Sequence, residues 1–393
     1  MFPTQFTGVS FTWERKKLGD VAEKVIQKNN NNAFKNVLTN SAEYGIISQR
    51  DFFERNIANK NNISTYYIVQ NDDFVYNPRI SNLAPYGPIN RNKTGYTGII
   101  SPLYYVFRVL NINTAFIEWY FKTTCWHKFM YQHGDSGARS DRFSIKDNEL
   151  KKLPIKLPAD DMEQEKIAKT LTSLDNTLQL HEDHLQFLHS FKSFLLQKMF
   201  FDNDIPPLLR FNKFTEKWNQ CRLNDHTIVT MGQSPNSKNY TNNQTGKILV
   251  QGNADLYKNK VLKRVFTTEV TKTAVKNDIL ISVRAPVGDI ARNQYESVVI
   301  GRGIASIKGN DFLYYQLEKM KNNGFWNKYI AGSTFESITG KDLKNTKIYT
   351  TNSDEERKIG NIFSSLTKII QLQEHKIDSL KKLKQFLLQN MFI

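Results

Sequence analysis

The sequence predicts an α+β protein, with two mixed α/β domains separated by two long helices that form an antiparallel coiled coil. Three observations predict an internal duplication with pseudo-twofold symmetry: a repeated helix-forming segment, heptad spacing in both copies, and a weaker repeat of the preceding segments. The predicted domains are 1–145, the first mixed domain; 146–202, the first helical region with its coiled-coil helix at about 161–200; 203–338, the second mixed domain; and 339–393, the second helical region with its helix at about 353–392.

The helical repeat is the clearest feature of the chain. A shift of 192 residues places 166–200 on 358–392, with 15 of 35 positions identical and with the endings FLLQKMF and FLLQNMF. Each copy begins with the pattern of a helix N-cap and a reciprocal side chain three residues later, Asp161 with Gln164 in the first copy and Ser353 with Glu356 in the second. Helices of this length, roughly 58 Å each, form a rod rather than a globular core.

Apolar residues in both copies recur at alternating steps of four and three, which is typical of the a/d seam of a coiled coil. Two polar residues, His181 and Gln373, occupy matching seam positions. The predicted coiled-coil interface comprises Ile167, Leu171, Leu174, Leu178, His181, Leu185 and Leu188 in the first helix, and Ile359, Phe363, Leu366, Ile370, Gln373, Ile377 and Leu380 in the second.

Two further seam positions hold lysines, Lys192 and Lys384. A parallel, in-register pair would bring both lysines into one core layer, which like-charge repulsion and desolvation oppose. We therefore predict an antiparallel pair. If it is centred near the middle of each helix, His181 faces Gln373 and a hydrogen bond between them fixes the register. The alternative is that His181 is a partly exposed helix residue without such a role.

The two mixed domains share a predicted order of strand, strand and helix. A shift of 205 residues also relates Trp13 to Trp218, Asp73 to Asp278 and Arg79 to Arg284. The expected elements are strands at 73–79 and 104–110, a loop at 85–98 and a helix at 114–131 in the first domain, and strands at 279–283 and 304–308 with a helix at 311–329 in the second.

Charge and composition indicate the kind of partner. The chain has 54 basic and 38 acidic residues and a net charge of +16, which favours a polyanionic partner, nucleic acid rather than a membrane surface. We find neither a signal peptide nor a run of 18 apolar residues. The two cysteines, Cys125 and Cys221, are far apart and belong to no paired motif. We therefore expect a cytoplasmic protein that has no contact with a membrane.

The unequal preservation of the repeat indicates a function. The helices keep their sequence, as expected for one shared task, whereas the domains keep only their framework, as expected for two different tasks. Reading two different DNA sequences is such a pair of tasks. Arg79 and Arg284 occur in both domains, so we expect phosphate or framework contacts from them.

Residues that read bases should lie in loops that do not align between the domains. Arg pairs with guanine and Asn or Gln with adenine, while Lys and Tyr suit phosphates. For each candidate, the alternative is a solvated surface side chain. The candidates are Asn90, Arg91, Lys93, Tyr96 and Arg139 in the first domain, and Gln233, Asn236, Lys238, Tyr240 and Arg302 in the second.

A small set of segments accompanies the duplicated helix endings. These are the approaches 160–167 and 353–359, the run 276–288 followed by Gly301-Arg302-Gly303, and the turn 232–235 with Tyr240 after it. With these segments, and over nearly its entire length, the chain resembles the specificity subunits of type I restriction-modification enzymes. The first domain has Asn77-Pro78-Arg79 and 101–104 in place of those glycine motifs and resembles a different recognition subtype.

The resemblance implies a non-catalytic subunit that binds a bipartite, gapped site in double-stranded DNA. Each target recognition domain would read one half-site, and the helices would set the spacing and dock two modification (methyltransferase) subunits. Restriction (translocase and nuclease) subunits would join this bacterial defence complex. The chain itself would carry no cofactor, because S-adenosylmethionine and ATP would bind the partner subunits. Two domains on a fixed spacer also predict half-sites about one helical turn apart.

Motifs of enzymes are absent from the sequence. It has no Asn/Asp-Pro-Pro-aromatic tetrad of an amino-methyltransferase and no P-loop. His181 and His184 lie one turn apart but lack a third ligand, so we expect no metal site. Two alternatives stay open: a stand-alone nuclease or methyltransferase, and a coiled-coil scaffold without DNA specificity. The salt dependence of DNA binding separates the scaffold from the recognition subunit.

Overall fold

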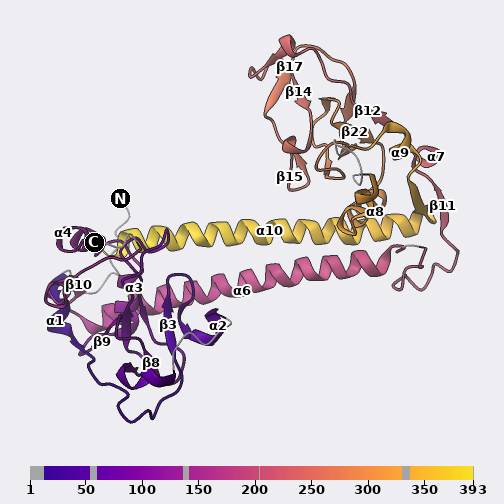
Figure 1. Ribbon diagram of the computed structural model, residues 1–393. Coiled ribbons are helices and arrows are strands. Elements are labelled where there is room, and N and C mark those ends of the chain that lie inside the picture. The colour runs from indigo at the N-terminus through magenta and orange to yellow at the C-terminus, as the bar shows by residue number, and fades with distance from the viewer. Residues whose placement is uncertain (1–12, 54–59, 136–140, 203, 330–336, 393) are drawn as a thin grey trace. The chain divides into compact units, whose positions relative to one another are not determined.

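The computed structural model describes residues 13–53, 60–135, 141–202, 204–329 and 337–392. The chain divides into two units: the first is Met1–His181 with Lys376–Ile393, and the second is Glu182–His375. Two helices of 39 residues, α6 (Asp161–Met199) and α10 (Ser353–Met391), each contribute one half to each unit. Each unit therefore contains one mixed domain and two helix halves (Figure 1).

The domain of the first unit is built on a four-stranded antiparallel sheet with the order β2-β9-β6-β7. Three antiparallel pairs, β1–β10, β3–β4 and β5–β8, complete its strands. The strands are β1 Trp13–Lys17, β2 Ala22–Lys24, β3 Leu38–Ser41, β4 Gly45–Ser48, β5 Tyr67–Val69, β6 Phe74–Tyr76, β7 Ile89–Arg91, β8 Gly98–Ile100, β9 Tyr105–Val109 and β10 Pro154–Pro158, and the helices are α1 Leu18–Val21, α2 Gln49–Phe53, the 3-10 helix η1 Lys60–Thr65, α3 Thr114–Phe121, α4 His127–His133 and α5 Asp147–Leu150.

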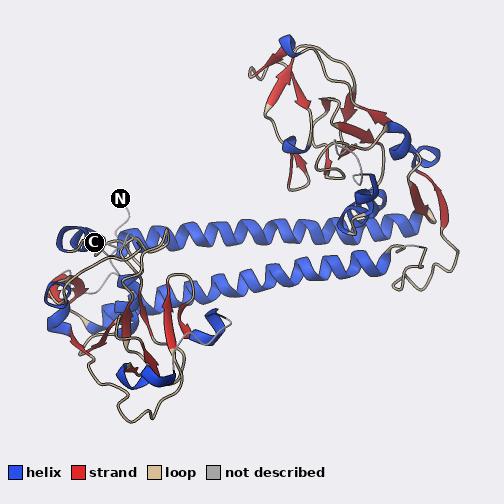
Figure 2. Cartoon of the chain, viewed as in Figure 1, coloured by secondary structure: helices blue, strands red, loops and turns tan. Residues whose placement is uncertain are grey.

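The domain of the second unit contains a six-stranded sheet, β12-β22-β19-β20-β16-β15, a five-stranded sheet, β13-β17-β14-β21-β18, and the pair β11–β23. Figure 2 shows its strands and short helices. The strands are β11 Asn219–Arg222, β12 Val229–Met231, β13 Tyr240–Thr241, β14 Lys247–Val250, β15 Leu256–Tyr257, β16 Lys260–Val261, β17 Val265–Thr267, β18 Thr273–Val275, β19 Ile279–Ser282, β20 Ile290–Arg292, β21 Ser297–Ile300, β22 Ile304–Ile307 and β23 Lys347–Thr350, and the helices are α7 Leu223–His226, α8 Asp311–Asn322, α9 Gly340–Lys344 and the 3-10 helices η2 Ser237–Asn239, η3 Asn253–Asp255 and η4 Phe325–Tyr329.

The two domains share one framework. The order β2-β9-β6-β7 reappears as β12-β22-β19-β20. The carboxylates of Asp73 and Asp278 accept equivalent backbone hydrogen bonds three residues upstream, of 2.7 and 2.9 Å. Asn92 and Asn293 are fully buried, and the backbone N–H of each donates to the carbonyl of the matching aspartate. The predicted internal duplication and fold class are confirmed.

The start of each long helix is tied to the adjacent domain by a tryptophan. The indole N–H of Trp13 donates to Glu163 at 3.3 Å, and that of Trp218 donates to Glu355 at 3.2 Å. Both carboxylates lie in the first turn of their helix, where negative charge is also favoured by the helix dipole. The contact is thus duplicated together with the helices.

The end of each long helix is buried in the core of a mixed domain. Phe392 packs against Phe116 with ring centroids 5.4 Å apart, and Phe200 packs against Phe312 at 5.1 Å. Full burial of an aromatic side chain stabilises a contact by about 2 to 3 kcal/mol. The Met-Phe pair that ends both repeats is therefore explained by anchoring of the helices.

Within each unit, the two helix halves run side by side in opposite directions (Figure 1). In the first unit Leu171 shares a buried cluster with Met391, and in the second Leu188 packs with Leu366 and Ile370. All fourteen predicted interface residues are buried or half-buried. The antiparallel arrangement is confirmed, whereas the pairing of His181 with Gln373, which belong to different units, stays a prediction.

The two seam lysines are both paired with carboxylates. Lys192 is only 9% exposed, and its ammonium lies 2.8 Å from Glu318 of α8 and 5.2 Å from the ring centre of Tyr315. Lys384 forms an ion pair with Asp175 of α6. The apolar seam therefore tolerates both lysines because each charge is matched where it is buried.

The predicted helix at 114–131 is wrong as a single element, because it is broken into α3 and α4. The hydroxyl of Thr123 donates to the carbonyl of Tyr120 at 2.7 Å, and the indole N–H of Trp126 donates to that of Phe121 at 3.1 Å. These side chains thus donate to backbone carbonyls that would accept from backbone N–H groups if the helix continued, and α3 ends there.

Two other predicted elements also differ. The helix expected at 311–329 ends at Asn322 and is followed by η4, because Gly324 adopts a left-handed backbone with a φ of +69°. The loop expected at 85–98 contains β7, which pairs with β6. The four predicted strands are present as β6, β9, β19 and β22.

Candidate nucleic-acid interface

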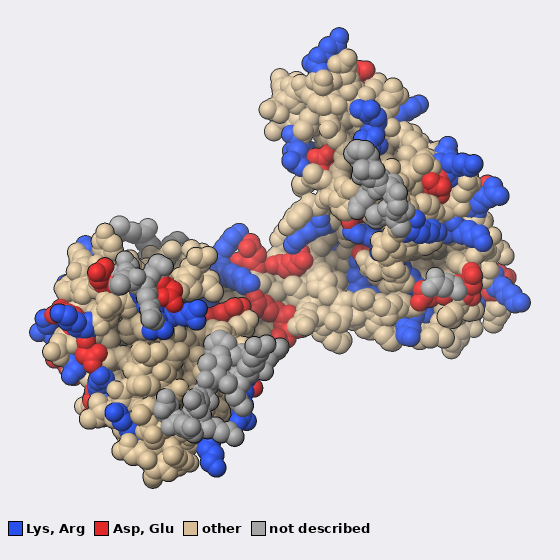
Figure 3. All heavy atoms as spheres, viewed as in Figure 1, with Lys and Arg blue, Asp and Glu red and all other residues tan. Residues whose placement is uncertain are grey.

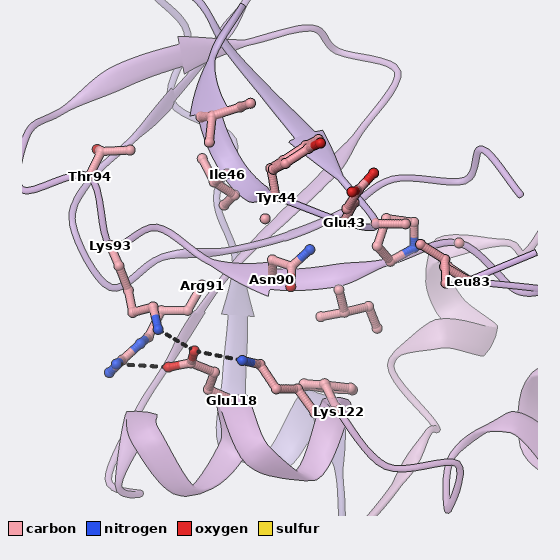
Figure 4. Close-up of a pocket in the computed structure, with 18 of the residues that line it drawn as sticks. Glu43, Tyr44, Ile46, Leu83, Asn90, Arg91, Lys93, Thr94, Glu118 and Lys122 are labelled. Carbon is pink, nitrogen blue, oxygen red and sulfur yellow. Dashed lines mark ion pairs between the residues drawn. The ribbon is translucent and has the colours of Figure 1, made fainter. Parts of the chain in front are cut away.

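A cleft of about 790 Å³ opens in the first unit beside β7 and α3 (Figure 4). Four of the predicted DNA-contacting residues line it: Asn90, Arg91, Lys93 and Tyr96. They come from β7 and the loop that follows, so the register of one strand and its turn brings them to the same wall. The predicted set in this domain is therefore a spatial cluster.

The amide of Asn90 is used within the domain. Its Nδ2 donates to the side-chain oxygen of Asn40 at 2.7 Å and to the carbonyl of Ser41 at 3.1 Å. Asn40 is itself buried and donates to the carbonyl of Val75 at 2.7 Å. For a bidentate contact with adenine, Asn90 must break one of these two hydrogen bonds so that its amide N–H can donate to the base.

Arg91 is also held by neighbouring side chains. Its Nη2 lies 2.8 Å from Glu118, and its Nη1 donates to Thr114 at 3.0 Å and lies 3.4 Å from Asp72. Its side chain is only 16% exposed. Among the described residues, no hydrogen-bond partner reaches its buried Nε.

Glu118 lies between three cationic side chains at the cleft (Figure 4). Its Oε1 lies 2.7 Å from the ammonium of Lys93 and 3.7 Å from that of Lys122, while its Oε2 binds Arg91. The carboxylate side chain is 8% exposed, whereas Lys93 is 56% exposed. Burial lowers the pKa of Lys122, and the charge of Glu118 opposes this shift.

The two arginines common to both domains occupy equivalent places. Arg79 forms a β-bridge with Arg142, and Arg284 forms one with Ser337. Both are exposed, so phosphate contacts from them are sterically open. Arg139, the remaining candidate of the first domain, lies outside the described residues.

In the second unit, the turn after β12 and the turn before β22 meet. The backbone N–H of Gln233 donates to the carbonyl of Ile300 at 2.9 Å, and that of Arg302 donates to the hydroxyl of Ser234 at 3.1 Å. Gln233 and Arg302, both exposed, therefore project from adjoining turns. The structure brings these two candidates together.

The other candidates of the second domain follow in η2 and β13. Asn236 caps η2 by accepting from the N–H of Lys238 at 3.2 Å, and its own N–H donates to Glu269 at 2.8 Å. The hydroxyl of Tyr240 donates to the carbonyl of Pro235 at 3.2 Å. Lys238 is exposed in this turn.

A comparison with protein families decides the identity of this fold. A family described as the type I restriction modification DNA specificity domain matches residues 11–189 and 215–382. The chain belongs to this family. The two matched regions contain both recognition-domain frameworks and most of each long helix.

The chain is similar in sequence to one type I specificity subunit and in fold to two solved ones. A putative type I restriction enzyme MjaX specificity subunit of Methanocaldococcus jannaschii is 31% identical over 258 residues, which cover 62% of this chain and 59% of that relative. The S subunit of the type I restriction-modification system of M. genitalium has a TM-score of 0.62 at 14% identity, over 100% of this chain and 99% of that one. The HsdS subunit of Thermoanaerobacter tengcongensis has a TM-score of 0.50 at 21% identity, over 98% and 97%.

Sequence reasoning missed two residues at this specificity domain's cleft, Glu118 and Lys122. One signal was available: Glu118 is the only charged residue in the otherwise apolar helix Thr114–Phe121. A lone carboxylate on a core helix needs a cationic partner. Glu269, which accepts from Asn236 and from the amide of Asn239 at 2.7 Å, was missed as well.

The surface of this type I specificity chain carries mixed charge. On the face that Figure 3 shows, Lys and Arg side chains are interspersed with Asp and Glu in both units. In the described part of the chain, His, Cys, Asp and Glu side chains form no group that could hold a metal ion. Among the same residues, no helix is long and apolar enough to cross a membrane.

Proposed function

We propose that the chain is the sequence-specific DNA-recognition subunit of a type I restriction-modification complex. The observation that carries this proposal is one framework with two different surfaces. The sheets β2-β9-β6-β7 and β12-β22-β19-β20 have the same order, whereas one domain presents the cleft beside β7 and the other presents the Gln233 and Arg302 turns. Each domain reads one half of a bipartite, gapped site.

Basic and amide side chains at both candidate surfaces support double-stranded DNA as the ligand. Lys93 and Lys238 are exposed and suit phosphates, and Gln233 and Arg302 have the donors and acceptors that distinguish bases in the major groove. The net charge of +16 attracts DNA from a distance. The chain acts by binding, and methyl transfer and cleavage belong to its partners.

The outer faces of the long helices support docking of two modification subunits. Large apolar side chains stand exposed on both helices, and three of them recur after 192 residues. Duplicated apolar surface suits two copies of one partner. The recurring pairs are Leu180 with Leu372, Phe191 with Leu383 and Phe194 with Phe386.

S-adenosylmethionine and ATP bind the modification and restriction subunits in this proposal, and none binds the chain itself. The helices also set the distance between half-sites, because each domain is anchored at a helix start and a helix end. The contacts of Trp13 with Glu163 and of Trp218 with Glu355 support this role.

The test is genome-wide detection of methylated adenines in cells that contain the chain with its modification subunit, against cells that lack the chain. A single gapped, two-part motif that disappears with the chain is the expected result. Unchanged methylation would contradict the proposal. Salt-dependent DNA binding and cleavage assays on the purified chain would then separate a scaffold from a stand-alone enzyme.

A further inference from the structure

We propose that Glu118 is a specificity-determining residue of the first domain, because its carboxylate occupies the place of a DNA phosphate among the cleft's cations. This inference rests on the proposed function. In the free protein the cations pair with Glu118. On binding, Lys93 and Lys122 exchange this carboxylate for a phosphate of the DNA backbone.

The two carboxylate oxygens of Glu118 differ in what holds them. Oε2 binds Arg91, which is fixed in turn by Thr114 and Asp72. Oε1 is shared by Lys93 and Lys122, at 2.7 and 3.7 Å. One side of the carboxylate is therefore anchored in the domain, and the other faces two flexible ammonium groups at the cleft.

Exposure decides which of the ion pairs can be exchanged. Arg91 and Glu118 are 16% and 8% exposed, so solvent and ligands do not separate them readily. Lys93 and Lys122 are 56% and 34% exposed and line the open cleft. Lysine is a flexible point charge and moves between oxyanions with little loss of geometry. Figure 4 shows both lysines reaching toward Glu118 from opposite sides.

The charge balance gives the consequence for specificity. The cluster has three cations, Arg91, Lys93 and Lys122, against two anions, Glu118 and Asp72. Contacts with the phosphate backbone of DNA form equally well with every sequence and therefore provide no discrimination between sequences. By occupying the lysines, Glu118 weakens binding to arbitrary DNA, and only a site that also forms base contacts offsets the loss of these ion pairs.

The test measures binding of the full-length chain to a random-sequence DNA duplex over a range of salt concentrations. Glu118→Gln keeps the shape of the side chain and removes its charge. We expect tighter binding at low salt and a steeper log–log salt slope, by about 0.9, for one more phosphate contact. Between 50 and 200 mM salt, the variant should lose about threefold more affinity than the wild type.

Three further variants make the result specific. Glu118→Asp retains the charge and should keep the wild-type slope. Lys93→Gln removes an exchanging cation and, on a duplex that contains the methylated motif, where the wild type makes the exchange, should make the slope shallower by about 0.9, which tests the proposal even if Glu118→Gln does not fold. Glu149→Gln is the matched control, since Glu149 pairs with Lys152 at 2.7 Å on the surface of the same unit.

A purely structural role of Glu118 predicts lower thermal stability with an unchanged slope, and this result would overturn the inference. If the folded wild-type chain binds no duplex at any salt concentration, the proposed function fails together with it. If the wild type binds with a salt-dependent affinity and both Glu118→Gln and Lys93→Gln keep its slope, only the role of Glu118 is rejected.

Discussion

The buried lysine of the second unit shows how single residues are fitted to the long helices. Lys192 pairs with Glu318, whose Oε2 is buried and, among the described residues, has no hydrogen-bond partner. The pair is thus imperfectly satisfied. Its desolvation offsets much of the attraction, so its presence adds little net stability compared with apolar side chains of the same size.

We expect Lys192→Met to destabilise the chain by about 3 kcal/mol, because it leaves Glu318 buried without a cation. The double variant Lys192→Met with Glu318→Met should regain wild-type stability or exceed it. Chemical denaturation of the three proteins measures this coupling. Lys382→Met, in the exposed pair with Asp378, is the control and should change stability by less than about 0.5 kcal/mol. Additive losses in the double variant would contradict the coupling.

Arg91 carries a second prediction at the residue scale. Arg91→Ala should relax discrimination at a base pair of one half-site only, by about 1 to 3 kcal/mol. The reason is local, because Arg91 fixes one wall of the cleft through Glu118 and Thr114. Competition binding with single-base variants of the methylated motif measures it. Uniform weakening over all sequences would instead assign Arg91 to a phosphate.

The limit of sequence reasoning is also visible at Arg91. Its residue type and its neighbourhood in the chain predicted a polar, DNA-facing residue. Its main partner, Glu118, is 27 residues away in another element, and only the packing of α3 against β7 brings the two together. Local sequence therefore singled out a segment that proves to line a cleft, but it did not reveal which of the charges there are already neutralised.

Among the elements, the long helices were predicted most closely. The a/d spacing is a local pattern repeated over several heptads, and the fourteen residues that it assigned to the seam are buried or half-buried in the structure. The shorter helices were predicted less well. The break after Phe121 depends on hydrogen bonds from Thr123 and Trp126, which residue spacing does not reveal.

If the long helices set the distance between the half-sites, shortening both helices should change that distance. Deleting Leu185–Leu188 together with the equivalent turn Ile377–Leu380 removes about one turn, or 6 Å, from each helix and keeps the seam nearly in phase. The gap between half-sites should shorten, and both half-sites should stay unchanged. Methylation mapping of cells with the shortened chain checks this.

Deletion of the turn in α6 alone is the control for helix length. The apolar seams of α6 and α10 then differ in length by one turn. This variant should therefore have a weaker helix pair, or should accept a wider range of gaps between the half-sites. A gap that stays at its original length after the double deletion would show that the helices are not the ruler.

For the molecule as a whole, the duplication predicts that the two domains act independently in recognition. Replacing residues 203–338 by the corresponding segment of another family member should change one half of the methylated motif and leave the other intact. The exchanged segment should carry a tryptophan at the position of Trp218, so that the anchoring contact with Glu355 is kept. Motif sequencing measures the outcome, and a change in both halves would contradict independence.

The duplication also creates a hazard during synthesis, because each long helix resembles its partner closely enough to associate with the same helix of a neighbouring chain. The counterpart of Asp175 in α10 is Thr367. In a mispaired assembly of two α10 helices, each Lys384 would meet a threonine where Asp175 normally supplies a carboxylate. Asp175 thus favours closure of each chain on itself over the pairing of two α10 helices.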